Sequence, residues 1–244
     1  MNDLGWVFIP GGGMSDWIWR DLDSEIRERA VLVPRRLKHN TAANRVRARL
    51  SDCVDFIEEL ITRAGFSQVV LVAHSGGGLL APLAAKRKAF KVERLIFVSA
   101  NIPAHNTNSL QDLPLSIRLL NGLAARMQLK RDATPLRRYE KLVRKKFCNA
   151  APEEAIEYVL GRDLLSEPLC VYDEKLDWSG LPRIPMTFIR LLNDKTASLS
   201  LQDRMAANLD IKDKYDIDAD HMVMLSRPRE FNAALRELAA ESGL

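Results

Sequence analysis

The sequence predicts an α/β protein with a mostly parallel, doubly wound sheet of about six strands and an inserted helical cap. Short apolar runs, rich in β-branched and aromatic residues, alternate with segments of helical periodicity. The apolar runs do not alternate with polar residues, which is typical of strands buried on both faces of a parallel sheet. The stretch 102–181 breaks this rhythm, because it carries helical patterns and no apolar run of the strand type.

The length and composition indicate a folded globular chain and exclude several other classes. The 244 residues are 47% hydrophobic and 28% charged, which provides enough apolar material for a core and excludes disorder, collagen and long coiled coils. The three cysteines are too few and too widely spaced for a disulfide framework or a zinc site. No apolar run is long enough to span a membrane, and the N-terminus lacks the pattern of a secretory signal. We therefore expect a cytoplasmic location and no membrane partner.

Six apolar runs are expected to form the strands, and each ends near turn-forming residues. In chain order they are 6–10, 31–33, 69–73, 95–98, 186–192 and 215–217. Between them, apolar residues recur at helical spacing from Val46 to Ile61, and Gly65 stands where a helix C-cap is expected. Small residues over 76–88 predict a helix that packs closely on the sheet, and 229–240 predicts a terminal helix. Strands and helices that alternate in this way predict right-handed crossovers.

The stretch without strands divides the predicted core into two parts of the chain. We expect 1–101 and 182–244 to form an α/β core, and 102–181 to form a helical cap over the sheet. The helical patterns within the cap are 115–127, 137–147 and 152–160.

The sharpest chemical signal is a serine between a predicted strand and a predicted helix. The run that ends at Ala73 leads through His74 into Ser75, and Gly76 and Gly77 follow directly. A nucleophile on such a sharp turn needs small neighbours, because the backbone and the helix approach closely there. The amide of Gly76 and the helix N-terminus would face an oxyanion formed at Ser75. The alternative is a structural serine that caps the helix.

A glycine loop, Gly11 to Gly13, follows the first predicted strand. Such a loop at the carboxyl end of a strand can offer a backbone N–H to a developing oxyanion, and Gly12 is our candidate. Two phosphate-binding alternatives fit poorly. No Lys-Ser/Thr pair follows, as a P-loop requires, and Asp16 stands at the sixth position from Gly11, where a dinucleotide fingerprint requires glycine. A plain flexible turn stays open as an alternative.

A histidine and an aspartate follow the last two predicted strands. His221 stands between the last strand and the terminal helix, and Asp194 follows the strand before it. Ligands bind at the carboxyl edge of a parallel sheet, where both side chains would meet Ser75. A carboxylate there can orient an imidazole and stabilise its cation, with Asp220 as the second choice of acid.

These residues stand in the order nucleophile, acid, histidine. The segments that carry a family resemblance are Phe8-Ile9-Pro10-Gly11-Gly12 with Trp17 and Trp19, Ala73-His74-Ser75-Gly76-Gly77, Asp194 with Leu201-Gln202, and Asp220-His221 with Ser226-Arg227-Pro228. Through them the sequence resembles the α/β-hydrolase superfamily, and more narrowly the esterase branch with plant methylesterases and hydroxynitrile lyases. The resemblance implies that Ser75 is the nucleophile, His221 the base and Asp194 the acid. It also implies that the amides of Gly12 and Gly76 form the oxyanion hole.

Two segments depart from the pattern of that family. Pro10 stands where the oxyanion loop usually has a histidine, so the hydrogen bonds that brace the loop must come from elsewhere. The segment 34–39, Pro-Arg-Arg-Leu-Lys-His, replaces the usual Asp-Leu-Pro-Gly-His-Gly after the second strand. We expect its basic residues to cover the edge of the sheet, and the alternative is that they border the pocket.

The resemblance implies a serine hydrolase that cleaves a small-molecule carboxylic ester through an acyl-enzyme, with no metal and no cofactor. The alternatives are a lyase or C–C hydrolase with the same three residues, and a non-catalytic receptor that keeps them in a ligand pocket. The net charge of +4 is mild, although the stretch 126–146 is strongly basic. Few aromatic residues stand near that stretch, so we expect a solvated helix face and no nucleic-acid partner. The oligomeric state stays open.

Overall fold

Six parallel strands form one central sheet in the computed structural model, which describes residues 4–111 and 131–240. They are β1 (Leu4–Ile9), β2 (Ala30–Leu32), β3 (Gln68–His74), β4 (Lys91–Val98), β7 (Met186–Leu191) and β8 (Asp213–Ile217). The strand order is β2-β1-β3-β4-β7-β8, and every neighbouring pair is parallel. Each strand overlaps one of the predicted apolar runs, and the predicted fold class is confirmed.

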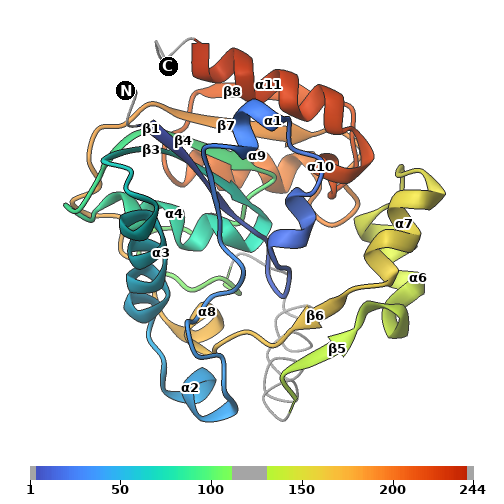
Figure 1. Cartoon of the computed structure of the whole chain (residues 1–244), viewed down its shortest axis with the longest axis horizontal. Helices are drawn as coiled ribbons and strands as arrows, with labels where there is room; N and C mark the ends of the chain where they lie inside the picture. The colour runs from blue at the N-terminus through green and yellow to red at the C-terminus, as the bar shows by residue number, and fades with distance from the viewer. Residues whose placement is uncertain (1–3, 112–130, 241–244) are drawn as a thin grey trace.

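Both faces of the sheet are buried under helices. Along β3, Val69 and Leu71 pack in one apolar cluster, whereas Val70 and Val72 pack in the other. The helices of the first layer are α3 (Leu50–Ala64), α4 (Ala81–Ala85) and α9 (Leu199–Ala207), and those of the second are α1 (Ser24–Arg27) and α11 (Pro228–Ala240). Figure 1 shows α3 and α4 on one side of the sheet and α1 and α11 on the other. Because successive strand residues point to opposite faces, burial of both faces produces the continuous apolar runs.

The helix α3 forms within the stretch of helical periodicity, but it starts later than predicted. It ends at Gly65, whose φ of +77° is the left-handed C-cap conformation expected of glycine. Val46 belongs instead to a separate helix, α2 (Ala42–Arg47), and is 54% exposed. The prediction that Val46 belongs to the same apolar stripe as Ile61 is wrong, because the extended backbone at Ala48 separates the two helices.

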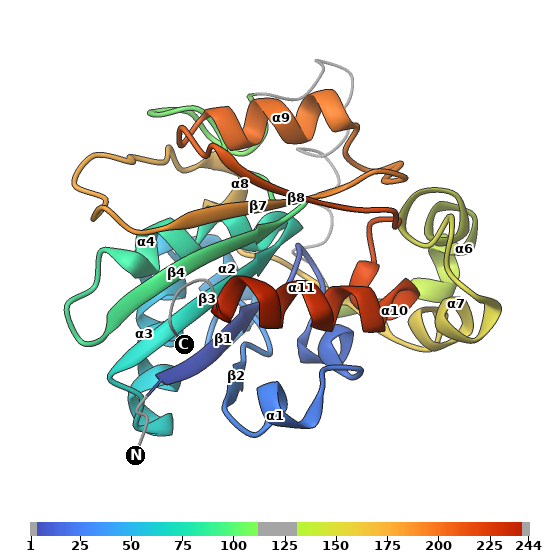
Figure 2. The ribbon, with the colours of Figure 1, turned by 90° about the horizontal axis from the view of Figure 1, so that it is seen from above.

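In the stretch 102–181, residues 131–173 lie beyond the carboxyl ends of the strands (Figures 1 and 2), whereas the chain from 174 leads back along the sheet, where Lys86 donates to the carbonyl oxygen of Asp177. The elements of this stretch are β5 (Ala133–Pro135), α6 (Glu140–Leu142), α7 (Glu153–Leu160), β6 (Asp163–Leu165) and α8 (Cys170–Asp173). The strands β5 and β6 form an antiparallel pair, so the expectation of a cap without strands is wrong. Strands this short are below the length at which a hydrophobic period can be recognised. The predicted helix at 115–127 lies outside the described residues.

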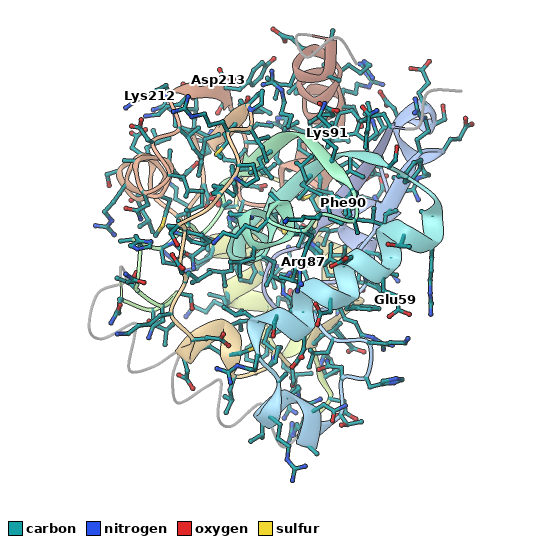
Figure 3. All side chains as sticks on the ribbon, turned by 90° about the vertical axis from the view of Figure 1, so that its left-hand side faces the viewer. Glu59, Arg87, Phe90, Lys91, Lys212 and Asp213 are labelled. Carbon is teal, nitrogen blue, oxygen red and sulfur yellow. The ribbon has the colours of Figure 1, made fainter. Side chains whose placement is uncertain are left out.

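The opposite edge of the sheet holds the amino ends of the strands. Figure 3 looks onto this edge, where Lys91 and Asp213 begin β4 and β8. Arg87 forms an ion pair with Asp55 of α3 there. In the ranges that the structure describes, no helix has both the length and the apolar character needed to cross a membrane.

Candidate active site

Ser75 occupies a tight turn between β3 and a short 3-10 helix (Ser75–Leu79). Its φ of +48° lies in the left-handed region, which costs a non-glycine residue about 1–3 kcal/mol. The small residues that follow are required by close packing. A Cβ on Gly77 would lie 2.5 Å from the carbonyl oxygen of Ile9, and one on Gly78 would lie 2.6 Å from that of Asn101. The residues after Ser75 therefore allow the chain to turn sharply at the carboxyl end of β3.

The imidazole of His221 joins Ser75 to Asp194. His221 Nε2 lies 3.1 Å from Ser75 Oγ, and His221 Nδ1 lies 2.6 Å from Asp194 Oδ2. Because an ionised carboxylate can only accept, Nδ1–H donates to Asp194, and Nε2 is free to accept the hydroxyl hydrogen of Ser75. The three residues follow the carboxyl ends of β3, β7 and β8. The structure thus brings together the three side chains that the sequence singles out.

The carboxylate of Asp194 is buried and hydrogen-bonded on both oxygens. Oδ1 accepts the backbone N–H groups of Thr196 (2.6 Å) and Ala197 (2.9 Å), and Oδ2 accepts the hydroxyl of Ser99 (2.7 Å) besides His221. Burial pushes the pKa of Asp194 upward, but the charge of His221 and these hydrogen bonds outweigh burial and hold the pKa below its usual value. Asp194 is therefore ionised near neutral pH and fixes the tautomer of the imidazole.

Ser99 is a site residue that the sequence reasoning missed. It directly follows β4, which pairs with β7, so its hydroxyl lies at the same edge of the sheet as Asp194. The available signal was a serine at the end of a predicted strand. That signal could be used only once β4 and β7 were known to be neighbours.

The glycine loop packs against the turn at Ser75. A Cβ on Gly76 would lie 3.0 Å from the backbone nitrogen of Gly12, and a Cβ on Gly11 would lie 3.1 Å from the Cβ of Ser75. The backbone amides of Gly12 and Gly76, the two residues predicted for the oxyanion hole, are therefore close neighbours beside Ser75. A side chain at Gly76 would push the loop away.

His74 contacts His221 from inside the core. The Nε2–H of His74 donates to the backbone carbonyl oxygen of His221 (2.9 Å), and the centroids of the two rings lie 4.7 Å apart. Burial, together with the charge of His221, lowers the pKa of His74 to about 3. His74 is therefore neutral at pH 7, and its hydrogen bond fixes the backbone of His221.

Asp220, the second choice of acid, makes no hydrogen bond to the imidazole. Its carboxylate accepts the backbone N–H groups of Ala150 (2.9 Å) and Met222 (3.1 Å). It thereby joins the loop that carries His221 to the stretch 102–181. Among the described carboxylates, Asp194 is the one that bonds to the ring of His221.

Ser75 and His221 line a cavity of about 130 Å³. Its apolar walls include Ala100, Leu201 and Met205. A cavity of about 150 Å³ holds a benzene ring, so this one has room for a compact group of comparable size or smaller. Within the described residues, no group of three or more His, Cys, Asp or Glu side chains is arranged to hold a metal ion.

Comparison with known protein families matches residues 6–234 to a model described as the alpha/beta hydrolase family. The chain belongs to the alpha/beta hydrolase family. This membership confirms the resemblance that the segments around Ser75 and His221 indicate, and it agrees with the observed sheet.

Individual relatives of this alpha/beta hydrolase are distant but extend over nearly all of it. Probable esterase PIR7A from Oryza sativa subsp. indica is 24% identical over 264 residues, covering 99% of each chain. An alpha-hydroxynitrile lyase from Arabidopsis thaliana is 26% identical over 200 residues, covering 76% of this chain and 75% of the relative. Among solved structures, an extracellular alpha/beta-hydrolase from a Paenibacillus species has a TM-score of 0.77 at 19% identity, covering 96% of this chain and 98% of the other.

Proposed function

We propose that this alpha/beta hydrolase cleaves small-molecule carboxylic esters, with Ser75 as nucleophile, His221 as base and Asp194 as acid. The observation that carries the proposal is the hydrogen-bonded line from Asp194 through His221 to the Ser75 hydroxyl. A serine hydroxyl is a weak nucleophile at neutral pH, and an adjacent imidazole that is itself oriented by a third group activates it. This arrangement therefore favours acyl transfer.

In the first half-reaction, Ser75 Oγ attacks the ester carbonyl while His221 Nε2 accepts its proton. The carbonyl oxygen becomes an oxyanion, and the amides of Gly12 and Gly76 donate hydrogen bonds to it. Asp194 stabilises the imidazolium that forms. His221 then gives its proton to the leaving alcohol, and the acyl group stays on Ser75.

Water completes the reaction. His221 removes a proton from a water molecule, whose oxygen attacks the acyl carbonyl. The same two amides donate hydrogen bonds to the second oxyanion, and this intermediate collapses as the bond to Ser75 Oγ breaks. Ser75 recovers its proton from His221, and the carboxylic acid leaves.

The cavity and the relatives support this substrate class. The cavity of about 130 Å³ beside Ser75 and His221 accommodates one small substituent of an ester among apolar side chains. The relatives include probable esterase PIR7A, and the similar structures include polyneuridine aldehyde esterase and a methylesterase from Arabidopsis. Those names describe those proteins, and for this chain they favour an ester over other acyl compounds.

A lyase reaction at the same residues is the second candidate. It is favoured by one observation, the similarity to an alpha-hydroxynitrile lyase over three quarters of each chain. Such an enzyme would use His221 to remove a proton from a substrate hydroxyl, with no acyl group on Ser75. Hydrogen cyanide release from mandelonitrile, in the absence of p-nitrophenyl ester turnover, would favour this candidate.

Fluorophosphonate labelling and p-nitrophenyl acetate hydrolysis test the proposal together. We expect wild-type protein to be labelled at Ser75 and to hydrolyse the ester, and Ser75→Ala and His221→Ala to lose about 10⁴-fold or more in kcat. Ser67→Ala is the matched control, because this exposed serine precedes the opposite end of the same strand. Absence of both labelling and turnover in the wild type would contradict the proposal and favour a ligand-binding role.

A further inference from the structure

A buried ion pair lies beside the glycine loop, outside the line that joins Asp194 to Ser75. Arg36 Nε lies 3.2 Å from Glu167 Oε2, and only 5% and 6% of these two side chains are exposed. Removing two charges from water is costly unless further hydrogen bonds satisfy them. The contacts of this pair therefore indicate what it does.

Both members of the pair hydrogen-bond to the backbone of the glycine loop. Arg36 Nη2 donates to the carbonyl oxygen of Pro10 (2.9 Å), and Glu167 Oε1 accepts the N–H of Gly13 (2.5 Å). These contacts hold the loop on both sides of Gly12. Within the loop, the N–H of Met14 donates to the carbonyl oxygen of Gly11 (3.1 Å), and among the described residues nothing lies within 4 Å of the Cβ position of Gly12.

The loop depends on such external contacts. Gly13 has a φ of +69°, and a glycine has no side chain with which to fix its backbone. The N–H of Leu165 adds a hydrogen bond to the carbonyl oxygen of Gly13 (2.7 Å). The guanidinium also reaches the nucleophile turn, because a Cβ on Gly76 would lie 3.4 Å from Arg36 Nη2. One ion pair therefore contacts the loop and approaches the turn that together hold the two amides.

This pair accounts for a departure from the family pattern. Pro10 has no backbone N–H and no polar side chain, so it cannot brace the loop as a histidine at this position can. We expected the basic segment 34–39 to cover the edge of the sheet. For Arg36 this expectation is wrong, because its guanidinium is buried against the glycine loop.

We propose that Arg36 and Glu167 are positioning residues that fix the Gly12 amide beside the Gly76 amide for binding of the oxyanion, a role that rests on the proposed esterase function. Donors stabilise an oxyanion best when they are already in place, since their rearrangement during the reaction would reduce the stabilisation. A glycine loop without external contacts samples many conformations. The ion pair therefore acts on the transition state and not on binding of the ester.

Three variants of the full-length protein separate positioning from stability. Glu167→Gln keeps an oxygen for the Gly13 N–H but removes the charge, and Arg36→Met removes the contact to Pro10. The double variant Arg36→Met/Glu167→Leu removes both buried charges, and apolar replacement of a buried pair often keeps or raises stability. We expect the double variant to fold, with a lower unfolding temperature than the wild type because the Gly13 N–H and the Pro10 carbonyl oxygen lose these partners. Its kcat on p-nitrophenyl acetate falls by about 10- to 100-fold, with KM within about twofold.

A trifluoromethyl ketone inhibitor provides the second measurement, because it adds to Ser75 and forms an oxyanion. Its inhibition constant is expected to rise in each variant by the factor by which kcat/KM falls. Arg94→Met is the control: Arg94 is also buried, but it contacts Asp213, which is labelled in Figure 3 at the opposite edge of the sheet. This control is expected to lose stability while it keeps kcat and inhibitor affinity.

A stable double variant with wild-type kcat overturns the positioning role, and so does an unchanged inhibition constant. An equal loss of kcat in Arg94→Met overturns it as well. If Arg36→Met does not fold, Glu167→Gln and the double variant carry the test. Failure of the proposed function is distinguishable, because wild-type protein would then show neither labelling nor turnover before any substitution is made.

Discussion

Acidification from pH 7 to pH 5 is expected to destabilise this protein through His74. Burial lowers the pKa of this imidazole from 6.5 to about 3 in the folded state. Between these two values the unfolded chain binds a proton that the folded chain does not. The free energy of unfolding is therefore highest above pH 6.5 and falls progressively toward pH 3. pH 5 lies 1.5 units below the unfolded pKa of 6.5. At about 1.4 kcal/mol per unit, the free energy of unfolding is therefore lower at pH 5 by about 2 kcal/mol.

Urea denaturation at pH 7, 6 and 5 measures this effect as a change in the free energy of unfolding. His74→Gln removes the titrating group and keeps an N–H that can reach the carbonyl oxygen of His221. The variant is expected to be less stable at pH 7 because of imperfect packing, but its stability should fall by about 2 kcal/mol less than that of the wild type at pH 5. His39→Gln makes the same substitution at an exposed imidazole and is the matched control.

Comparison of the wild type with His74→Gln isolates His74, since these two proteins share every other titrating group. If the wild type and His74→Gln lose stability equally between pH 7 and pH 5, the buried imidazole is not the acid-sensitive group and the argument fails. The same conclusion follows if His39→Gln alone flattens the curve.

Three further predictions concern catalysis, packing and specificity. Asp194→Asn leaves the side chain in place but no longer stabilises the imidazolium, so kcat on p-nitrophenyl acetate should fall by about 10³- to 10⁴-fold; a loss below tenfold would contradict the role of this carboxylate. Gly77→Ala forces a Cβ to 2.5 Å from the Ile9 carbonyl oxygen and should lower the free energy of unfolding in urea by about 2 kcal/mol or more. Gly161→Ala, where the new Cβ meets atoms at 3.5 Å, should change it little, and equal effects would refute the packing argument. Leu201→Ala enlarges the cavity, so the ratio of kcat/KM for p-nitrophenyl hexanoate to that for the acetate should rise about tenfold; an unchanged ratio would place the acyl chain elsewhere.

Strand prediction succeeds where burial alone determines the residue pattern. The run around Val70 is apolar at every position because each face of β3 packs in its own cluster, and this information is local in the sequence. The pair β5 and β6 fails this condition, since Asp163 and Pro135 stand in its register and neither strand is long enough to show a period. Helix α2 was not predicted as a separate helix for a related reason: two extended residues, Ala48 and Arg49, separate it from α3, and no glycine or proline marks the break.

Some residues of the candidate site could be predicted from the sequence, and others could not. Ser75, Asp194 and His221 could be expected together because the carboxyl ends of parallel strands meet at one edge, and each residue follows a strand end. Arg36 and Glu167 could not, since they are 131 positions apart and their contact depends on how the stretch 102–181 folds back on the core. Local patterns can therefore indicate the residues proposed to react, whereas the residues proposed to position the glycine loop meet only through contacts between distant parts of the chain.

Two aspartates flank the imidazole, one in sequence and one in space, and their surroundings shift their pKa values in opposite directions. Asp220 precedes His221 directly, but burial raises its pKa even though the N–H groups of Ala150 and Met222 oppose that shift. The pKa of Asp194 is lowered by the charge of the imidazole and by the hydrogen bonds that its carboxylate accepts from the imidazole, a hydroxyl and two backbone amides. The surroundings of Asp194 thus favour the charged form that stabilises an imidazolium, whereas burial of Asp220 opposes that form. Position at the end of β7, and not proximity in the chain, therefore makes an aspartate the partner of this histidine.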